Sequence, residues 1–116
     1  MAGQLTTHAL DLVLGHGAGG MKVGVRRIGP DEPWIAEVEL DEGGRGVLLE
    51  GEALAAGLYE LNFQVGDYHR ARGLVEGEGD GFLEEVPVRF RVSDDLAHHH
   101  IPLLISLYGY STYRGG

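Results

Sequence analysis

Cysteine is absent from this chain of 116 residues. The fold therefore contains no disulfide, no thiolate is available as a nucleophile, and a zinc site built on cysteine is excluded. The absence does not by itself decide the compartment. We expect a cytoplasmic protein as the default.

Basic residues are scarce. Nine Lys and Arg residues stand against 18 Asp and Glu residues, which gives a formal net charge of -9 at pH 7. Such a chain repels the phosphate groups of nucleic acids and the anionic headgroups of membranes. We therefore expect small molecules or proteins as partners, with no nucleic acid and no membrane.

Long apolar runs are also missing. The longest, over residues 101–107, is interrupted by Ser106 and is far too short to span a bilayer. The start, MAGQLTTHAL, has no basic region followed by an apolar block, so we expect no leader peptide. The length is usual for one domain, and we expect a single domain over residues 1–116.

The apolar residues that are present recur with a period close to two, in short bursts between turns that contain glycine. The 20 glycines are unfavourable for a helical protein. This pattern predicts a mainly β protein, with turns over residues 15–20, 29–33 and 76–81. Strands are expected over residues 5–12, 21–28, 34–40, 46–49, 58–65, 86–92, 98–106 and 109–113. So many strands in a short chain favour a sandwich.

One short helix is expected over residues 67–73, with Asp67 as its N-cap and Gly73 as its terminator. Two turns are unstable alone, so this helix must pack on a sheet. Residues 75–85, rich in Gly and Glu, are expected to form an exposed loop.

Several residues carry only a structural expectation. His16 and His69 are predicted to be surface or turn residues without a role. Phe90, Tyr108 and Tyr110 are predicted to be core aromatics.

Two of the expected strands mix histidine with aliphatic side chains on one face. Side chains alternate along a strand, so His98, His100 and Leu104 share one face, and His8 and Leu10 share one face of their strand. The opposite face of residues 98–106 carries Ile101, Leu103 and Ile105, which should build the core. A solvated face is mainly polar, so the mixed faces indicate burial against another subunit or around a ligand. We expect a symmetric homo-oligomer whose subunits share a cleft at these histidines.

Five segments carry a resemblance to a known family: THALD at 7–11, GGR at 43–45, GLYELNF at 57–63, FLEEVPVRF at 82–90 and HHHIPLLISLYGYSTYRGG at 98–116. In this order and spacing they resemble the transthyretin-like 5-hydroxyisourate hydrolase family over almost the whole chain. The resemblance implies an all-β, transthyretin-like sandwich of two four-stranded sheets with one short helix. It also implies a homotetramer with active sites at the dimer–dimer interface.

The activity implied by the resemblance is hydrolysis of 5-hydroxyisourate in urate catabolism. The six-membered ring opens at an amide bond to give 2-oxo-4-hydroxy-4-carboxy-5-ureidoimidazoline, with neither cofactor nor metal. The family's catalytic residues fall on His8, Arg45 and His100, and its substrate-binding positions on His98, Ser111, Tyr113 and Arg114. The tail departs from the family pattern at three positions. Gly116 replaces a terminal Ser, Leu107 replaces a proline, and His99 replaces an aromatic residue.

These residue types suit amide hydrolysis, which needs a base for water and a positive group where the carbonyl oxygen becomes negative. Histidine, with a reference pKa near 6.5, offers a neutral acceptor at pH 7. Arg45 has planar donors that can hold the substrate and stabilise the oxyanion. We hypothesise that His8 and His100 are the base and acid pair, without an assignment of which is which.

Alternative interpretations remain at this point. Transthyretin has the same sandwich but is a carrier, and fold alone does not separate a carrier from an enzyme. Transthyretin lacks histidines at the positions of His8, His98 and His100, and it lacks the Tyr-Arg-Gly ending of this chain. A zinc site on His8, His98 and His100 is disfavoured because two of these lie at alternate positions on one strand, and no acidic residue is evident that would orient their rings. Arg45 and Arg114 also have a structural interpretation, as a strand-edge charge and a terminal cation.

Overall fold

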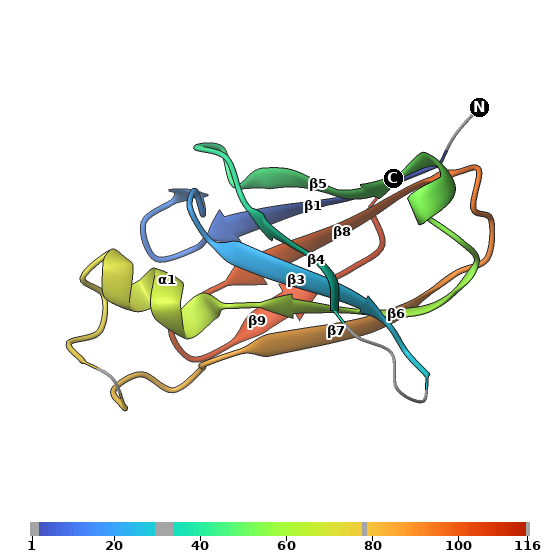
Figure 1. Cartoon of the computed structure of the whole chain (residues 1–116). Coiled ribbons are helices and arrows are strands. Elements are labelled where there is room, and N and C mark those ends of the chain that lie inside the picture. Colours follow the sequence, from blue (N-terminus) through green and yellow to red (C-terminus); the bar gives the residue numbers. More distant parts are fainter. Residues whose placement is uncertain (1–2, 30–33, 78, 116) are drawn as a thin grey trace.

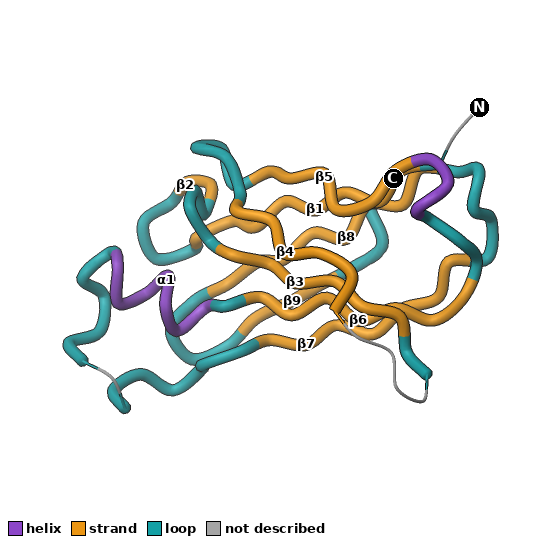
Figure 2. The backbone as a smooth tube through the Cα atoms, in the orientation of Figure 1, coloured by secondary structure: helices purple, strands orange, loops and turns teal. Residues whose placement is uncertain are grey.

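A computed structural model describes residues 3–29, 34–77 and 79–115 of the chain (Figure 1). Two β-sheets pack face to face, and the molecule extends 43 × 30 × 20 Å along its principal axes. The strands run along the length of the molecule and most loops gather at its ends (Figure 2). No helix in the described part of the chain is long and apolar enough to cross a membrane.

The first sheet contains β1 (Gln4–Asp11), β2 (His16–Gly17), β5 (Arg45–Glu50), β8 (His98–Ile105) and β9 (Tyr110–Thr112). β8 pairs in parallel with the whole length of β1 and pairs antiparallel with β9. The other edge of β1 is shared, because β5 pairs with residues 4–8 and β2 with residues 10–11. The sheet is therefore three strands wide beside residues 4–8 of β1 and four strands wide beside residues 10–11, where β9 joins it.

The second sheet is antiparallel throughout, in the order β4 (Trp34–Glu39), β3 (Lys22–Arg27), β6 (Gly57–Phe63) and β7 (Val86–Val92). A 3-10 helix, η1 (Gly51–Ala53), links β5 to β6, and α1 (Val65–Ala71) follows β6. The predicted all-β sandwich with one short α-helix is confirmed. The first sheet counts five strands because the predicted turn over residues 15–20 contains the short strand β2.

The eight predicted strands all form, with ends within two residues of those expected. The described residues of the predicted loop over 75–85 contain neither helix nor strand. Residues 30–33 of the predicted turn over 29–33 lie outside the described residues, as does Gly116.

The helix α1 begins two residues earlier than predicted. Val65 was expected to end the preceding strand, but it is fully buried in the first turn of α1. Asp67 is therefore inside the first turn and is not the N-cap. Gly73, with φ of 71°, follows the C-cap Arg72, so the predicted terminator is confirmed.

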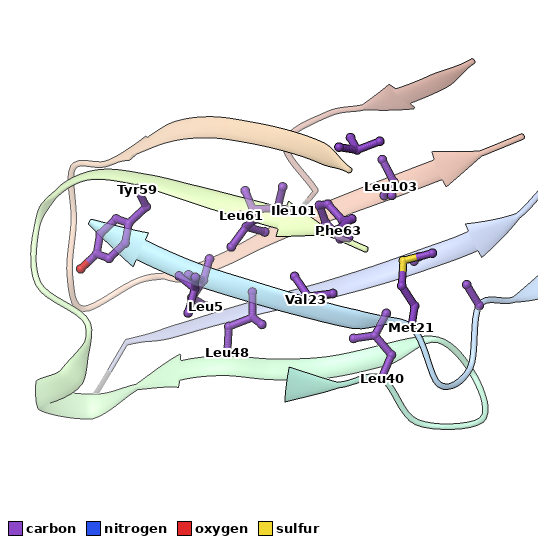
Figure 3. Packing of buried hydrophobic residues seen from close by; sticks show 14 of the residues in the cluster. Leu5, Met21, Val23, Leu40, Leu48, Tyr59, Leu61, Phe63, Ile101 and Leu103 are labelled. Carbon is purple, nitrogen blue, oxygen red and sulfur yellow. The ribbon is translucent and has the colours of Figure 1, made fainter. Parts of the chain in front are cut away.

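The core lies between the two sheets, where inward side chains interdigitate (Figure 3). Its fully buried members include Leu5, Val23, Leu61, Phe63 and Leu103. The predicted inner face of β8 is confirmed, because Ile101, Leu103 and Ile105 are all buried, although Pro102 of the opposite face is buried as well. Burying one such side chain stabilises the fold by about 1.5–3 kcal/mol, so this inner face holds β1 and β8 in place beneath their outer faces.

Three structural expectations are wrong. His69 is only 2% exposed, since α1 packs on the sandwich with this residue on its buried face. Tyr108 and Tyr110 are exposed, because they lie at the β8–β9 turn beyond the inner face of β8. Phe90 does pack against the core and stacks on Tyr59, with 6.0 Å between ring centroids.

Candidate active site

The outer face of the first sheet brings together three of the residues singled out in the sequence. Burial alternates along β1, which places Thr6 and His8 on its outer face. In the strand register His8 lies opposite Arg45 of β5, and Thr6 lies opposite His100 of β8. His8, Arg45 and His100 thus come from three neighbouring strands of one sheet and lie on the same side of it.

A tight turn before β5 delivers Arg45 to this face. The carboxylate of Asp41 accepts hydrogen bonds from the backbone N–H groups of Gly43 and Arg45, at 2.9 Å each. Gly44 adopts φ of 79° and accepts a 2.8 Å hydrogen bond from the N–H of Ala9 in β1. A Cβ at Gly44 would collide with the carbonyl oxygen of Ala9, so glycine is required where the turn touches β1.

The same turn fixes the ring of His8. Nε2 of His8 lies 2.9 Å from the carbonyl oxygen of Gly43. A carbonyl oxygen only accepts, so Nε2 carries the proton of this bond. In a neutral His8 the unprotonated nitrogen is then Nδ1.

A hydroxyl group joins the other two histidines. Oγ1 of Thr6 lies 2.7 Å from Nε2 of His98 and 2.8 Å from Nδ1 of His100. The two imidazole rings are 6.1 Å apart between centroids. The sequence analysis missed Thr6; its position two residues before His8, on the same face of a predicted strand, is the signal that identifies it.

The environment of His100 favours its neutral form. Burial lowers the pKa of His100 below its ordinary value, and electrostatic repulsion from the neighbouring His98, His8 and Arg45 lowers it further. His100 is therefore mainly unprotonated on one nitrogen at pH 7. The site offers a proton acceptor and a guanidinium group on one face, as hydrolysis of an amide requires.

The C-terminal candidates lie on the far side of β8 from β1. Ser111 of β9 is opposite Leu104 in the register, and its side chain is exposed. Tyr113 and Arg114 are exposed and line a cavity of about 510 Å³ between β7 and the segment β8–β9, together with Phe90 and other residues. The structure thus gathers His8, Arg45, His98 and His100 on one sheet, and His100 also lines the cavity of Tyr113 and Arg114. Ser111 is not among the residues that line this cavity.

A metal site was the second alternative for these histidines. Within residues 3–29, 34–77 and 79–115, no three His, Cys, Asp or Glu side chains are placed so that they could hold a metal ion. The imidazoles of His98 and His100 that would have supplied ligands instead hydrogen-bond to Thr6.

Comparisons with known proteins agree on one family. The model of the HIUase/Transthyretin family matches residues 5–115. The chain is 48% identical to 5-hydroxyisourate hydrolase 2 of Rhizobium meliloti (strain 1021), over 98% of this chain and 97% of that protein.

Two solved structures share the fold over nearly their whole length. The 5-hydroxyisourate hydrolase of Klebsiella pneumoniae superimposes with a TM-score of 0.81 at 30% identity, covering 97% of this chain and 99% of that one. Sea bream transthyretin in complex with thyroxine superimposes with a TM-score of 0.84 at 26% identity, covering 96% and 93%.

Proposed function

The chain belongs to the HIUase/transthyretin family, and we propose that it is a 5-hydroxyisourate hydrolase. Water adds to an amide carbonyl of the six-membered ring and the ring C–N bond breaks, which gives 2-oxo-4-hydroxy-4-carboxy-5-ureidoimidazoline in urate catabolism. The observation that supports this proposal is the convergence of His8, Arg45 and His100 on one face, in a chain 48% identical to a relative of that name.

The proposed roles follow from the chemistry of each group. His8 and His100 form the pair that takes a proton from water and gives one to the leaving nitrogen, a task worth about 10²–10⁴-fold in rate. Arg45 holds the polar edge of the substrate and stabilises the oxygen that becomes negative. His98, Ser111, Tyr113 and Arg114 are proposed to bind substrate.

The proposed assembly is a homotetramer with active sites at the dimer–dimer interface, formed by a single domain over residues 1–116. Its support is the outer face of the first sheet, where Val47 is 46% exposed and Leu10 and Leu104 are half-buried beside the histidines. Size-exclusion chromatography with light scattering tests this assembly, and a monomer at assay concentration contradicts it.

A cytoplasmic location is proposed from the sequence, and fractionation of the source cells tests it.

The decisive experiment generates fresh 5-hydroxyisourate from urate with urate oxidase and follows its decay by ultraviolet absorbance. The wild-type protein is expected to accelerate the decay. His100→Asn and His8→Asn are expected to slow this catalysis by about 10²-fold or more. His16→Asn, which changes an exposed histidine on β2, is the matched control and should retain wild-type turnover.

A carrier of the transthyretin type is the second candidate, favoured by the structural likeness to sea bream transthyretin. The same assay separates the two. A decay equal to the spontaneous one in the presence of wild-type protein supports the carrier. Turnover that survives in His100→Asn contradicts the assignment of His100.

A further inference from the structure

The hydroxyl of Thr6 lies between two imidazoles on the outer face of the first sheet. It is 2.7 Å from Nε2 of His98 and 2.8 Å from Nδ1 of His100, both within range of short hydrogen bonds. Thr6 and His100 are also direct partners in the parallel register of β1 and β8. The backbone of His100 is held as well, because its carbonyl oxygen accepts a 2.8 Å hydrogen bond from the N–H of Gly115.

A hydroxyl group has one proton, so it can donate to only one of the two rings. If both rings donated to Thr6, its own proton would have no acceptor among the hydrogen bonds of the described residues. All three groups satisfy one another within the described residues only when the hydroxyl donates to one imidazole and accepts an N–H from the other. Two arrangements satisfy this rule, and they differ in which nitrogen of His100 carries the proton.

The two arrangements differ in what His100 can do. If Nδ1 accepts from Thr6, Nε2 already carries the proton, and a second proton has to enter at the nitrogen that faces Thr6. If Nδ1–H donates to Thr6, Nε2 is free to accept a proton, and the bond to Thr6 survives when the ring becomes charged. No hydrogen bond among the described residues occupies Nε2 of His100. Only the second arrangement lets His100 exchange a proton without a rotation of Thr6.

We propose that Thr6 is a positioning residue of the active site. Its hydroxyl donates to Nε2 of His98 and accepts from Nδ1–H of His100, so that His100 exchanges protons with water and substrate at Nε2. This inference rests on the proposed hydrolase function. Thr6 touches no reacting atom and acts through the orientation and tautomer of His100, in the way that a hydrogen-bond partner orients a ligating histidine.

The first test reads the tautomer without substrate. Nitrogen NMR on protein labelled with [15N]histidine is expected to show His100 protonated at Nδ1 and unprotonated at Nε2 above pH 7 in the wild type. Thr6→Val removes the hydroxyl at almost constant shape and should lose this preference, while Thr6→Ser should retain it. A wild-type spectrum with the proton on Nε2, or one that Thr6→Val leaves unchanged, overturns the proposal.

The second test measures turnover of 5-hydroxyisourate. Thr6→Val is expected to lower kcat by roughly 10- to 100-fold with little change in KM, and Thr6→Ser should restore most of kcat. The matched control is Thr7→Val, which removes a hydroxyl that donates to the carbonyl oxygen of Ile101 (2.7 Å) on the inner face of the same strand pair. It should keep the wild-type kcat and tautomer.

Valine suits a strand, so Thr6→Val is expected to fold, and its thermal transition checks this. If Thr6→Val does not fold, Thr6→Ala takes its place, with the same loss of tautomer expected. Equal kcat in the wild type and a folded Thr6→Val overturns the positioning role. Failure of the function itself is distinguishable, since an inactive wild type would still show the tautomer spectrum that tests Thr6.

Discussion

Replacing His69 with leucine is expected to stabilise the protein. His69 is 2% exposed on the buried face of α1, and its Nε2 is buried without a hydrogen-bond partner in the described part of the chain. An unsatisfied buried polar group costs about 1–3 kcal/mol. His69→Leu removes this cost, and repacking an aliphatic side chain of similar volume costs less than about 1.5 kcal/mol. The free energy of unfolding should rise by about 1 kcal/mol at pH 7.

The gain is expected to grow as the pH falls. Burial lowers the pKa of His69, while the carboxylate of Asp11 acts in the opposite direction. The unfolded chain therefore binds a proton at this histidine below pH about 6.5, whereas the folded chain keeps it neutral. Folded wild-type protein loses up to ~1.4 kcal/mol per pH unit from this group as the pH drops below that value. His69→Leu lacks this loss.

The assay is urea unfolding followed by far-ultraviolet circular dichroism between pH 5.5 and 8. Protein concentration is held constant, because the stability of an oligomer depends on it. His16→Leu, at an exposed histidine, is the control and should change the free energy of unfolding by less than about 0.5 kcal/mol. A His69→Leu protein that is less stable than the wild type at every pH, or whose advantage is the same at pH 5.5 and 8, refutes the reasoning.

Three further outcomes are expected. His98→Gln removes an imidazole whose charged form repels a proton on His100, so the acid limb of the kcat/KM profile should move to higher pH; a shift to lower pH contradicts this electrostatic account. Tyr68→Phe deletes a 2.7 Å hydrogen bond to the buried carboxylate of Asp11 and should lower the free energy of unfolding in urea by about 1.5–3 kcal/mol. An unchanged free energy of unfolding contradicts this role of the hydrogen bond. Exhaustive dialysis against a chelator should leave hydrolysis of 5-hydroxyisourate unchanged, and lost activity that zinc restores would support the metal alternative.

The strands were predictable because alternation along a strand depends on local geometry alone. An inward face of Ile101, Leu103 and Ile105 can be read from spacing, and it places His98 and His100 on the other face. The same reasoning places His8 on the outer face of its strand. That these strands are neighbours came from the structure, since periodicity says nothing about which strands pair.

The start of α1 and the burial of His69 were not predictable from local signals. Asp67 is a good capping residue, yet the helix begins at Val65 because that side chain packs into the core. Histidine is intermediate in its preference for the surface, so its type did not indicate that His69 would be buried. In both cases packing between distant segments outweighed the local preference.

By itself, the sequence determined the β character of this protein, the alternating faces of its strands and the residue types available for hydrolysis, because each follows from short-range geometry and side-chain chemistry. The tertiary structure decided which of these residues meet. The parallel register of β1 and β8 places Thr6 between His98 and His100, and the tight turn at Gly44 holds Arg45 beside His8. Contacts between residues more than 90 positions apart depend on how the whole chain packs, and no local pattern encodes the register that creates them.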